Sequence, residues 1–284
     1  MGSDGLVALR VGPWWTHKHS YLRRYIDIFA RGMKRKWQTR VFVDLYSGPG
    51  LLVERGSNRE YEGSPLIAVG HPTGFTHYFF NDVDSRNAEA LKQRLKRRGI
   101  ANCRIYSLPA EQAALNIAAD LRRLRFEAGD FVGLAFIDPV GSPHSMVSLT
   151  ALTALTDGMR LDLLITFHTQ SYKRMLGQAA SRYRRGTLQV QDLEGICAIF
   201  GIDASEMAQF LEKRASTRFL LDLYQKTLQR LGYHFFESEE GIEPVIRNTV
   251  KAPLYHLIFA SKHERGGEFW AKIKRGATPQ GSFW

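Results

Sequence analysis

Short apolar runs alternate with amphipathic segments along the first 168 residues of the chain. Each apolar run is closed by a turn residue or a carboxylate and has the length of a buried parallel strand. The expected strands are residues 41–45, 77–82, 103–106, 131–137 and 161–168. Helices are expected from Ser64 onward and at residues 87–98, 109–125 and 144–156. This alternation predicts an α/β fold with a parallel, doubly wound sheet and helices on both faces.

An amphipathic helix is predicted for residues 17–38, ahead of the first strand. Its apolar face consists of Tyr21, Tyr25, Ile28, Phe29 and Met33, at three- and four-residue spacing. The remaining surface is basic and includes Lys18, Arg31, Lys34 and Arg35. A solvated helix face would explain these charges, but with a single Asp to pair them they suit phosphates better.

After the first strand, the stretch from Tyr46 to Gly63 is expected to be a long loop, and loops of this length are commonly functional. Ser64 is expected as the N-cap of the next helix, with Pro65 at the first helical position.

The second half of the chain departs from the regular alternation. Residues 169–231 are predicted to be mostly helical and carry a second basic and aromatic cluster. Its members are Tyr172, Lys173, Arg174, Arg182, Tyr183, Arg184 and Arg185. Strands expected at residues 233–237 and 254–260, without a full helix between them, should form an antiparallel hairpin at the sheet edge.

The predicted elements divide the chain into four parts. Residues 1–40 form a basic helix packed on the core, and residues 41–168 form the core itself. Residues 169–231 are a helical insertion, and residues 232–284 complete the core with a hairpin and a helix.

Composition and charge narrow the class of protein. A formal net charge of +11 and a pI near 9.7 favour a polyanionic partner, although basic enzymes with small substrates are common. Cys103 and Cys197 are too few for a disulfide framework or a thiolate metal site, so no metal site is predicted. Neither a run of about 18 apolar residues nor a signal-like region is present, so a cytoplasmic protein without a membrane anchor is expected.

Candidate polar residues lie where the predicted strands end. Asp44 and the turn Ser47-Gly48-Pro49-Gly50 end the first strand, and Asp82 ends the second. Residues 107–111 follow the third strand, and Asp138-Pro139 follows the fourth. Ligands of open parallel sheets bind outside the carboxyl ends of the strands. A tight turn would account for a lone Gly-x-Gly, but carboxylates at three strand ends indicate a ligand site.

The spacing within this site distinguishes between cofactors. A nicotinamide site needs a G-x-G-x-x-G turn that runs straight into a helix, and no third glycine follows Gly50 at that spacing. Asp82 suits ribose hydroxyls, and a carboxylate near the turn suits a cationic ligand. S-adenosylmethionine has a ribose and an amino acid that bears a sulfonium, so it is the expected cofactor.

The segment Asp44-Leu45-Tyr46-Ser47-Gly48-Pro49-Gly50 resembles motif I of the class I S-adenosylmethionine-dependent methyltransferases. Asp82-Val83-Asp84 resembles their ribose-binding strand end, and Asp138-Pro139-Val140-Gly141 resembles the Asp-Pro-Pro-Tyr motif of amino-methylating enzymes. The resemblance implies a Rossmann-like, mostly parallel sheet with an antiparallel C-terminal hairpin and an added helical segment. It implies cofactor contacts from Asp44, Tyr46, Ser47, Gly48, Pro49, Gly50, Asp82, Val83 and Leu108, and catalysis by Asp138 and the Pro139 carbonyl.

More narrowly, residues 14–274 are similar to the three-Cys-motif partner proteins. The similarity is carried by residues 17–18, motif I and residues 63–68, 136–141 and 257–263. The cysteine motif of that family belongs to its partner, so the resemblance implies a protein partner with three cysteines.

Two segments depart from the family pattern. Val140-Gly141 replaces the second proline and the aromatic residue that would stack on a target base. Ser107-Leu108-Pro109-Ala110 stands where many relatives carry an acid that contacts the adenine amino group, so backbone groups or Glu111 would serve instead.

Two functions remain open at this point. The first is methyl transfer to an amine of a nucleic acid, with Asp138 and the Pro139 carbonyl accepting hydrogen bonds from that amine. The substrate would be bound near the strand ends by Lys18, Arg31, Lys34, Arg35, Tyr172 and Lys173. The second is a non-catalytic nucleic-acid-binding partner protein that retains the fold. A nucleotide-dependent oxidoreductase is disfavoured by the missing third glycine.

Overall fold

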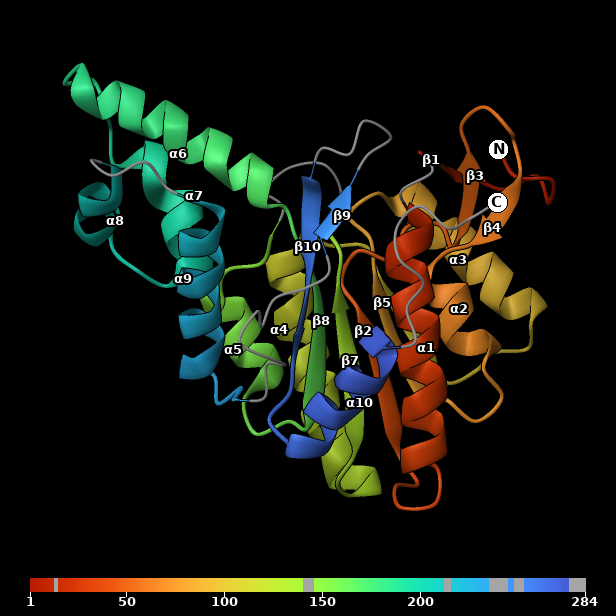
Figure 1. The fold of residues 1–284 in the computed structure, drawn as a ribbon. Helices are drawn as coiled ribbons and strands as arrows, with labels where there is room; N and C mark the ends of the chain where they lie inside the picture. Colours follow the sequence, from red (N-terminus) through yellow and green to blue (C-terminus); the bar gives the residue numbers. More distant parts are fainter. Residues whose placement is uncertain (13–14, 140–145, 212–215, 235–244, 248–252, 276–284) are drawn as a thin grey trace.

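The computed structural model describes residues 1–12, 15–139, 146–211, 216–234, 245–247 and 253–275. Within them, a seven-stranded sheet has the order β6-β5-β2-β7-β8-β10-β9 (Figure 1). Its strands are β2 (Arg40–Asp44), β5 (His77–Asn81), β6 (Cys103–Tyr106), β7 (Val132–Ile137), β8 (Leu161–Phe167), β9 (Val245–Arg247) and β10 (Pro253–Ala260). Strands β6, β5, β2, β7 and β8 are parallel, and β10 lies antiparallel between β8 and β9. The predicted Rossmann-like sheet with an antiparallel C-terminal hairpin is therefore confirmed.

Two hydrophobic cores lie on opposite faces of this sheet, because side chains alternate between the faces along each strand. Phe42 of β2 packs into one core, and its neighbours Val41 and Val43 pack into the other. The Phe42 core is covered by α1 (Trp15–Met33), α2 (Ser64–Gly70), α3 (Ser85–Arg97) and α10 (Glu264–Arg275). The other core is covered by α4 (Ala110–Ala128), α5 (Leu149–Thr156) and the helices that follow β8.

The segment after β8 is mostly helical, as predicted. It contains α6 (Thr169–Arg184), α7 (Gln191–Phe200), α8 (Ala204–Leu211) and α9 (Thr217–Arg230). Leu176, Leu193 and Tyr224 join the Val41 core, so these helices pack on the sheet, while the far end of α6 projects beyond it (Figure 1). None of the described helices combines the length and the hydropathy of a membrane span.

The predicted long loop between the first strand and the next helix is wrong. Two strands, β3 (Leu51–Glu54) and β4 (Glu60–Glu62), form an antiparallel hairpin there. The N-terminal strand β1 (Leu9–Val11) pairs with β3 in parallel and completes a three-stranded sheet. The hairpin follows the glycine turn directly, so it begins at the carboxyl edge of the main sheet.

Several predicted boundaries need correction. Helix α1 ends at Met33 rather than at residue 38. Gly63 is the N-cap of α2 and Ser64 is its first residue. Residues 146–148 precede α5 without being helical, and residues 144–145 lie outside the described residues. Of the strand expected at 233–237, residues 233 and 234 are not in a strand and the rest is not described, so the hairpin partner of β10 is β9.

Arg94 of α3 ties the N-terminal segment and the glycine turn to the helix layer. Its side chain is only 4% exposed and donates to both carboxylate oxygens of Asp4, at 2.7 and 2.8 Å. It also donates to the carbonyls of Val7, at 2.7 Å, and Pro49, at 2.6 Å. A buried guanidinium with four such bonds is costly to disturb, because its partners would lose their donor.

We expect Arg94→Met to lower the free energy of unfolding by about 3 kcal/mol, since it leaves Asp4 and two carbonyls without their donor. Arg97→Met is the matched control. The Arg97 side chain is 56% exposed and lies 3.9 Å from Asp4, so its loss should change the free energy by less than about 0.5 kcal/mol. Urea unfolding followed by circular dichroism measures both, and equal losses would contradict a special role for Arg94.

Candidate functional site at the carboxyl edge of the sheet

The glycine turn after β2 is held by hydrogen bonds to the neighbouring strand end. Gly48 and Gly50 have positive φ of 59° and 83°, a conformation that favours glycine. The Gly48 N–H donates to Asp82 Oδ2 at 2.9 Å, and the Ser47 N–H donates to the Asn81 carbonyl at 2.8 Å. A Cβ added at Gly48 would meet nothing within 4 Å, so the backbone of the turn faces open space there.

Asn81 joins three strand ends and was missed by the sequence analysis. Its side-chain amide donates to the carbonyls of Leu45, at 3.0 Å, and Leu108, at 3.1 Å, and its side-chain oxygen accepts from the Leu108 N–H at 3.1 Å. The residue is 1% exposed. An Asn at the end of an apolar run is a signal that could have found it, because a buried amide needs partners. Leu108, predicted to bind the cofactor, is thereby fixed through its backbone.

Asp82 has both carboxylate oxygens engaged by the protein. Besides Gly48, it accepts from the Asp84 N–H at 2.9 Å and from the Asn87 side chain at 3.2 Å. It therefore shapes the glycine turn and the start of α3. Its neighbour Val83, also predicted to contact the cofactor, is 70% exposed and presents an apolar side chain at this edge.

Asp44 is a buried carboxylate with one oxygen unsatisfied. It is fully buried, Oδ1 accepts from the Tyr46 N–H at 3.0 Å, and Oδ2 has no hydrogen-bond partner. Burial raises the pKa of Asp44 to about 7, the bonds from Ser64 and Tyr46 oppose that rise, and the charges of Asp138 and Asp82 add to it. These three predicted carboxylates are therefore close enough to sense one another, and the unpaired oxygen is suited to a cation.

Asp138 and Pro139, at the end of β7, are already engaged by two basic side chains. The Lys18 ammonium on α1 forms an ion pair with Asp138, and His168 Nε2, beyond the end of β8, lies 2.9 Å from the Pro139 carbonyl. Because a carbonyl only accepts, Nε2 of His168 carries the proton. Burial alone would raise the pKa of Asp138, but the charge and the hydrogen bond of Lys18, together with smaller contributions that include the nearby His168, outweigh burial and hold the pKa below its usual value.

Aromatic and histidine rings surround this ion pair. The Lys18 ammonium lies 5.8 Å from the centre of the Tyr255 ring, and the His168 ring lies 5.8 Å from the same ring. His19 is 4% exposed, and burial, together with the Lys18 charge, lowers its pKa to about 3. The Asp138 carboxylate is thus largely shielded from solvent, and its counter-ion is Lys18.

One predicted substrate contact is wrong, and two other predicted contacts already have partners within the protein. Tyr172 has no exposed surface and stacks inside the core against Phe167, with ring centres 4.7 Å apart, so it cannot stack on a base. Lys18 forms an ion pair with Asp138, so binding a phosphate would require it to share or leave that carboxylate. Glu111, offered as a substitute for the adenine acid, instead accepts from the Ser148 N–H at 2.5 Å and hydroxyl at 2.8 Å at the start of α5. Val140 and Gly141 lie outside the described residues.

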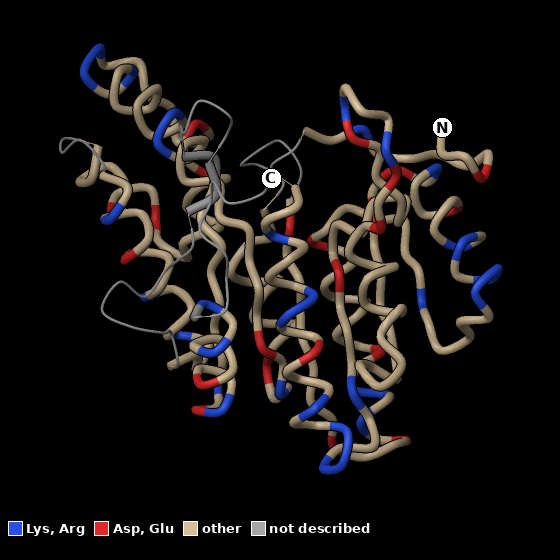
Figure 2. The backbone as a smooth tube through the Cα atoms, turned by 45° about the vertical axis from the view of Figure 1, so that its right-hand side comes forward, with Lys and Arg blue, Asp and Glu red and all other residues tan. Residues whose placement is uncertain are grey.

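Arg31, Lys34 and Arg35 lie at the opposite edge of the sheet from the start of α6, so these two groups do not flank one site. Arg31 pairs with Asp27, and Lys34 and Arg35 are exposed between the end of α1 and the start of β2, at the amino edge. Helix α6 instead begins directly after the carboxyl end of β8 and carries Lys173 in its first turns. Figure 2 shows Lys and Arg on α6 at the top of the molecule and others at its lower end.

Replacing Lys18 should change how the free energy of unfolding depends on pH, because Asp138 loses its counter-ion. Above the unfolded pKa near 4, the ion pair stabilises the wild type, and this contribution is lost as pH falls through the depressed folded pKa. In Lys18→Met the buried carboxyl has a raised pKa, so its charge costs free energy as pH rises. We expect a difference that is small near pH 4 and reaches about 3 kcal/mol near pH 7. Urea unfolding across this range measures it; a difference independent of pH would contradict the pairing.

No family model matches this sequence, and no curated protein matches it. Solved structures with a similar arrangement include an rRNA methylase from Streptococcus thermophilus, with 17% identity and a TM-score of 0.33 over 59% of this chain and 76% of that one. Another is magnesium protoporphyrin IX methyltransferase from Synechocystis PCC 6803 with bound SAH, with 11% identity and a TM-score of 0.41 over 87% of this chain and 83% of that one. Similarity at this level assigns neither a substrate nor a residue role to this protein.

Proposed function

We propose that the protein is an S-adenosylmethionine-dependent methyltransferase that acts on an amine of a nucleic acid. The observation that carries the proposal is the unpaired, buried Oδ2 of Asp44 beside a glycine turn that faces open space. A cation with a ribose attached fits this edge, because Asp44, Asp82 and Asp138 are gathered there and Val83 offers an apolar surface. The residues present therefore fit the cofactor.

Each residue of the edge has a distinct task in this proposal. Asp44 and the backbone of Gly48 would hold the amino-acid part of the cofactor, while Asp82 would keep the turn in shape and face the ribose. When bound, S-adenosylmethionine supplies an electrophilic methyl group on a sulfonium. The Asp138 carboxylate and the Pro139 carbonyl would orient the amine lone pair toward that methyl group, so that catalysis rests mainly on positioning.

Basic side chains on both sides of the carboxyl edge support a nucleic-acid target. Lys173 and Arg174 lie on α6, and Arg55 and Arg59 are exposed on the β3–β4 hairpin. With a net charge of +11, the whole chain attracts a polyanion. A partner with a three-cysteine motif, and membership of the three-Cys-motif partner proteins, stay predictions from the sequence.

A non-catalytic nucleic-acid-binding role is the second candidate. The observation that favours it is that both acceptors of the proposed target amine already have partners, Lys18 on Asp138 and His168 on the Pro139 carbonyl. Methyl transfer would require Lys18 to share or leave the carboxylate when the amine arrives. A protein that only binds nucleic acid would keep this ion pair closed.

Isothermal titration calorimetry with S-adenosylmethionine and with NAD tests the cofactor. Binding of the first and not of the second supports the proposal, and the reverse result would make the site a nicotinamide site. Asp82→Asn keeps the shape of the side chain but removes its charge, so it should weaken binding about tenfold by loosening the Gly48 contact. Asp120→Asn, a carboxylate on α4 that is bound by Arg104, is the control and should bind as the wild type does.

The raised pKa of Asp44 predicts a pH dependence of cofactor binding. Below pH 7 the carboxyl carries a proton, which it must lose when a cation binds beside it. Affinity for S-adenosylmethionine should therefore rise roughly tenfold between about pH 5.5 and 7, a range in which the amino group of the cofactor stays charged. Asp44→Asn should bind more weakly and lose this dependence. Calorimetry at several pH values measures both, and an unchanged slope in the variant would place the cation elsewhere.

The Asp138→Asn variant should lose methyl transfer while it keeps cofactor binding. Incorporation of labelled methyl groups into mixed RNA and DNA is expected for the wild type and should fall at least a hundredfold in Asp138→Asn, because the variant offers no carboxylate to the amine. Cofactor affinity should stay within about threefold, since Asp44 and the turn are intact. Nucleic-acid binding without incorporation by the wild type would instead support the non-catalytic role.

A further inference from the structure

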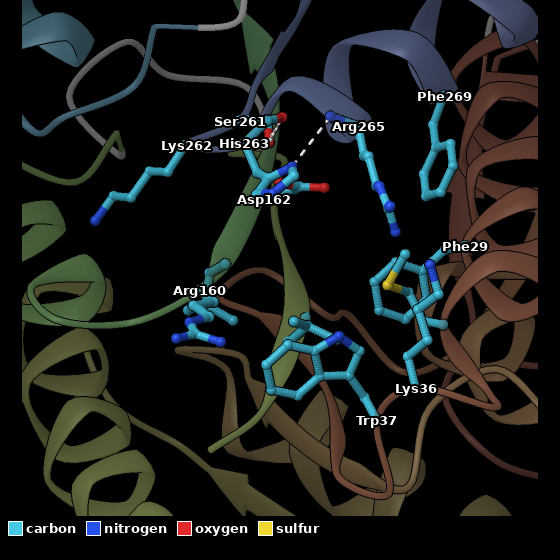
Figure 3. A pocket seen from close by; sticks show the side chains of 15 residues that line it. Phe29, Lys36, Trp37, Arg160, Asp162, Ser261, Lys262, His263, Arg265 and Phe269 are labelled. Carbon is cyan, nitrogen blue, oxygen red and sulfur yellow. Dashed lines mark hydrogen bonds between the residues drawn. The ribbon is translucent and has the colours of Figure 1, made fainter.

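A cavity of about 780 Å³ is lined by residues at the amino edge of the sheet, the edge opposite the glycine turn. Figure 3 shows its lining side chains. Its floor is made by the first residues of β7 and β8, Val132, Gly133, Leu161 and Asp162. Ser261, which follows the antiparallel strand β10, and the start of α10 close one side. The volume lies within the range of small-molecule sites. None of the tasks assigned to the carboxyl edge uses this cavity.

Aromatic rings line one part of the cavity. Figure 3 shows Trp37 at its lower side and Phe29 and Phe269 on the side formed by α1 and α10. The guanidinium of Arg160 lies 5.1 Å from the Trp37 ring centre, so a cation already lies against the indole. Phe29 is only 3% exposed, whereas Trp37 and Phe269 are half-buried, so a planar ring could stack on Trp37 or on Phe269.

Cationic groups surround the same space. Lys36, Arg160 and Arg265 line it from three separate parts of the chain: the turn after α1, the residue before β8 and the first turn of α10. Arg160 also lies 3.4 Å from Asp130, and its side chain remains 58% exposed. Lys262 is turned aside, since its ammonium donates to the Thr156 carbonyl at 2.6 Å. Three cations are thus placed around an aromatic cavity.

Asp162 is the one acidic side chain among the lining residues, all of which are described. Its carboxylate accepts a hydrogen bond from the Tyr25 hydroxyl, which comes from the core side of α1. The acid is therefore bound from within the protein, and the outer part of the cavity keeps a positive charge. Lys34 and Arg35, both exposed, extend that charge beyond Lys36.

We propose that this cavity binds a nucleotide unit, with its base against Trp37 and its phosphate held by Lys36, Arg160 and Arg265. Aromatic walls alone would suit any apolar molecule, and the cations alone any anion. Their combination selects a planar ring joined to a phosphate. The unit could belong to a free nucleotide or to a single strand that runs on over Lys34 and Arg35. The site is separate from the carboxyl edge and does not depend on the function proposed there.

The test is calorimetry at low salt with uridine 5′-monophosphate, with ribose 5-phosphate and with an eight-nucleotide oligouridine. A pyrimidine is chosen so that the probe carries no adenosine. The base should make uridine 5′-monophosphate bind at least fivefold more tightly than ribose 5-phosphate. Oligouridine binding at least tenfold more tightly than the mononucleotide identifies a strand as the source; equal binding identifies the free nucleotide. Both results support the site.

Two variants and a control locate the binding. Arg160→Gln should weaken binding about tenfold or more, and Trp37→Leu at least fivefold, whereas Trp37→Phe should retain most of the affinity. Arg184→Gln, at the far exposed end of α6, should bind as the wild type does. The proposal is overturned if no probe binds, if ribose 5-phosphate binds as tightly as the nucleotide, or if Arg160→Gln and Arg184→Gln behave alike. S-adenosylmethionine binding at the carboxyl edge, measured in parallel, should be the same in all of these variants as in the wild type.

Discussion

The side chain of Asn81 is the contact on which the carboxyl edge depends. It bonds to the backbone on either side of β5, at Leu45 and Leu108, while its own carbonyl holds Ser47. Three strand ends that are distant in sequence are thereby fixed relative to one another. With the edge fixed in this way, Asp82 accepts a hydrogen bond from the Gly48 N–H. Asp44 stays buried, and the backbone at Gly48 still faces open space. The edge is therefore pre-organised by the Asn81 side chain, whose amide nitrogen and oxygen are both hydrogen-bonded.

The fold was predictable because its signals are local. Apolar runs of four to seven residues, turn residues after them and amphipathic stretches between them lead directly to the parallel sheet. The β3–β4 hairpin was not predicted because its strands have only four and three residues, and β3 also pairs with β1 near the N-terminus. Such pairing depends on contacts between distant residues, and short strands carry too little periodic pattern to reveal it. The position of Asp44 and the glycines, by contrast, could be read from the strand end itself.

The substrate residues were less predictable, although part of the signal was present. Lys18 precedes Leu22 and Tyr25 by four and seven residues, so it lies on the buried stripe of α1 and not on its charged face. Tyr172 has the same relation to Leu176 and Ala179 on α6, and all three are buried. Lys18 and Tyr172 were assigned to the exposed basic clusters on residue type alone. Their positions relative to the apolar residues of each helix would have placed both on the buried face. The residues that they contact there depend on the tertiary structure.

The ion pair of Lys18 with Asp138 would also reconcile an acidic site with the proposed nucleic-acid target. Asp44, Asp82 and Asp138 together would repel phosphates, even in a chain with a net charge of +11. Lys18 neutralises Asp138, which lies nearest to the proposed target amine, and burial favours a proton on Asp44 until a cation replaces it. The edge can therefore be nearly neutral before its ligands arrive. Charge would then develop only where the sulfonium and the amine compensate it, so binding of the two ligands should be coupled through these carboxylates.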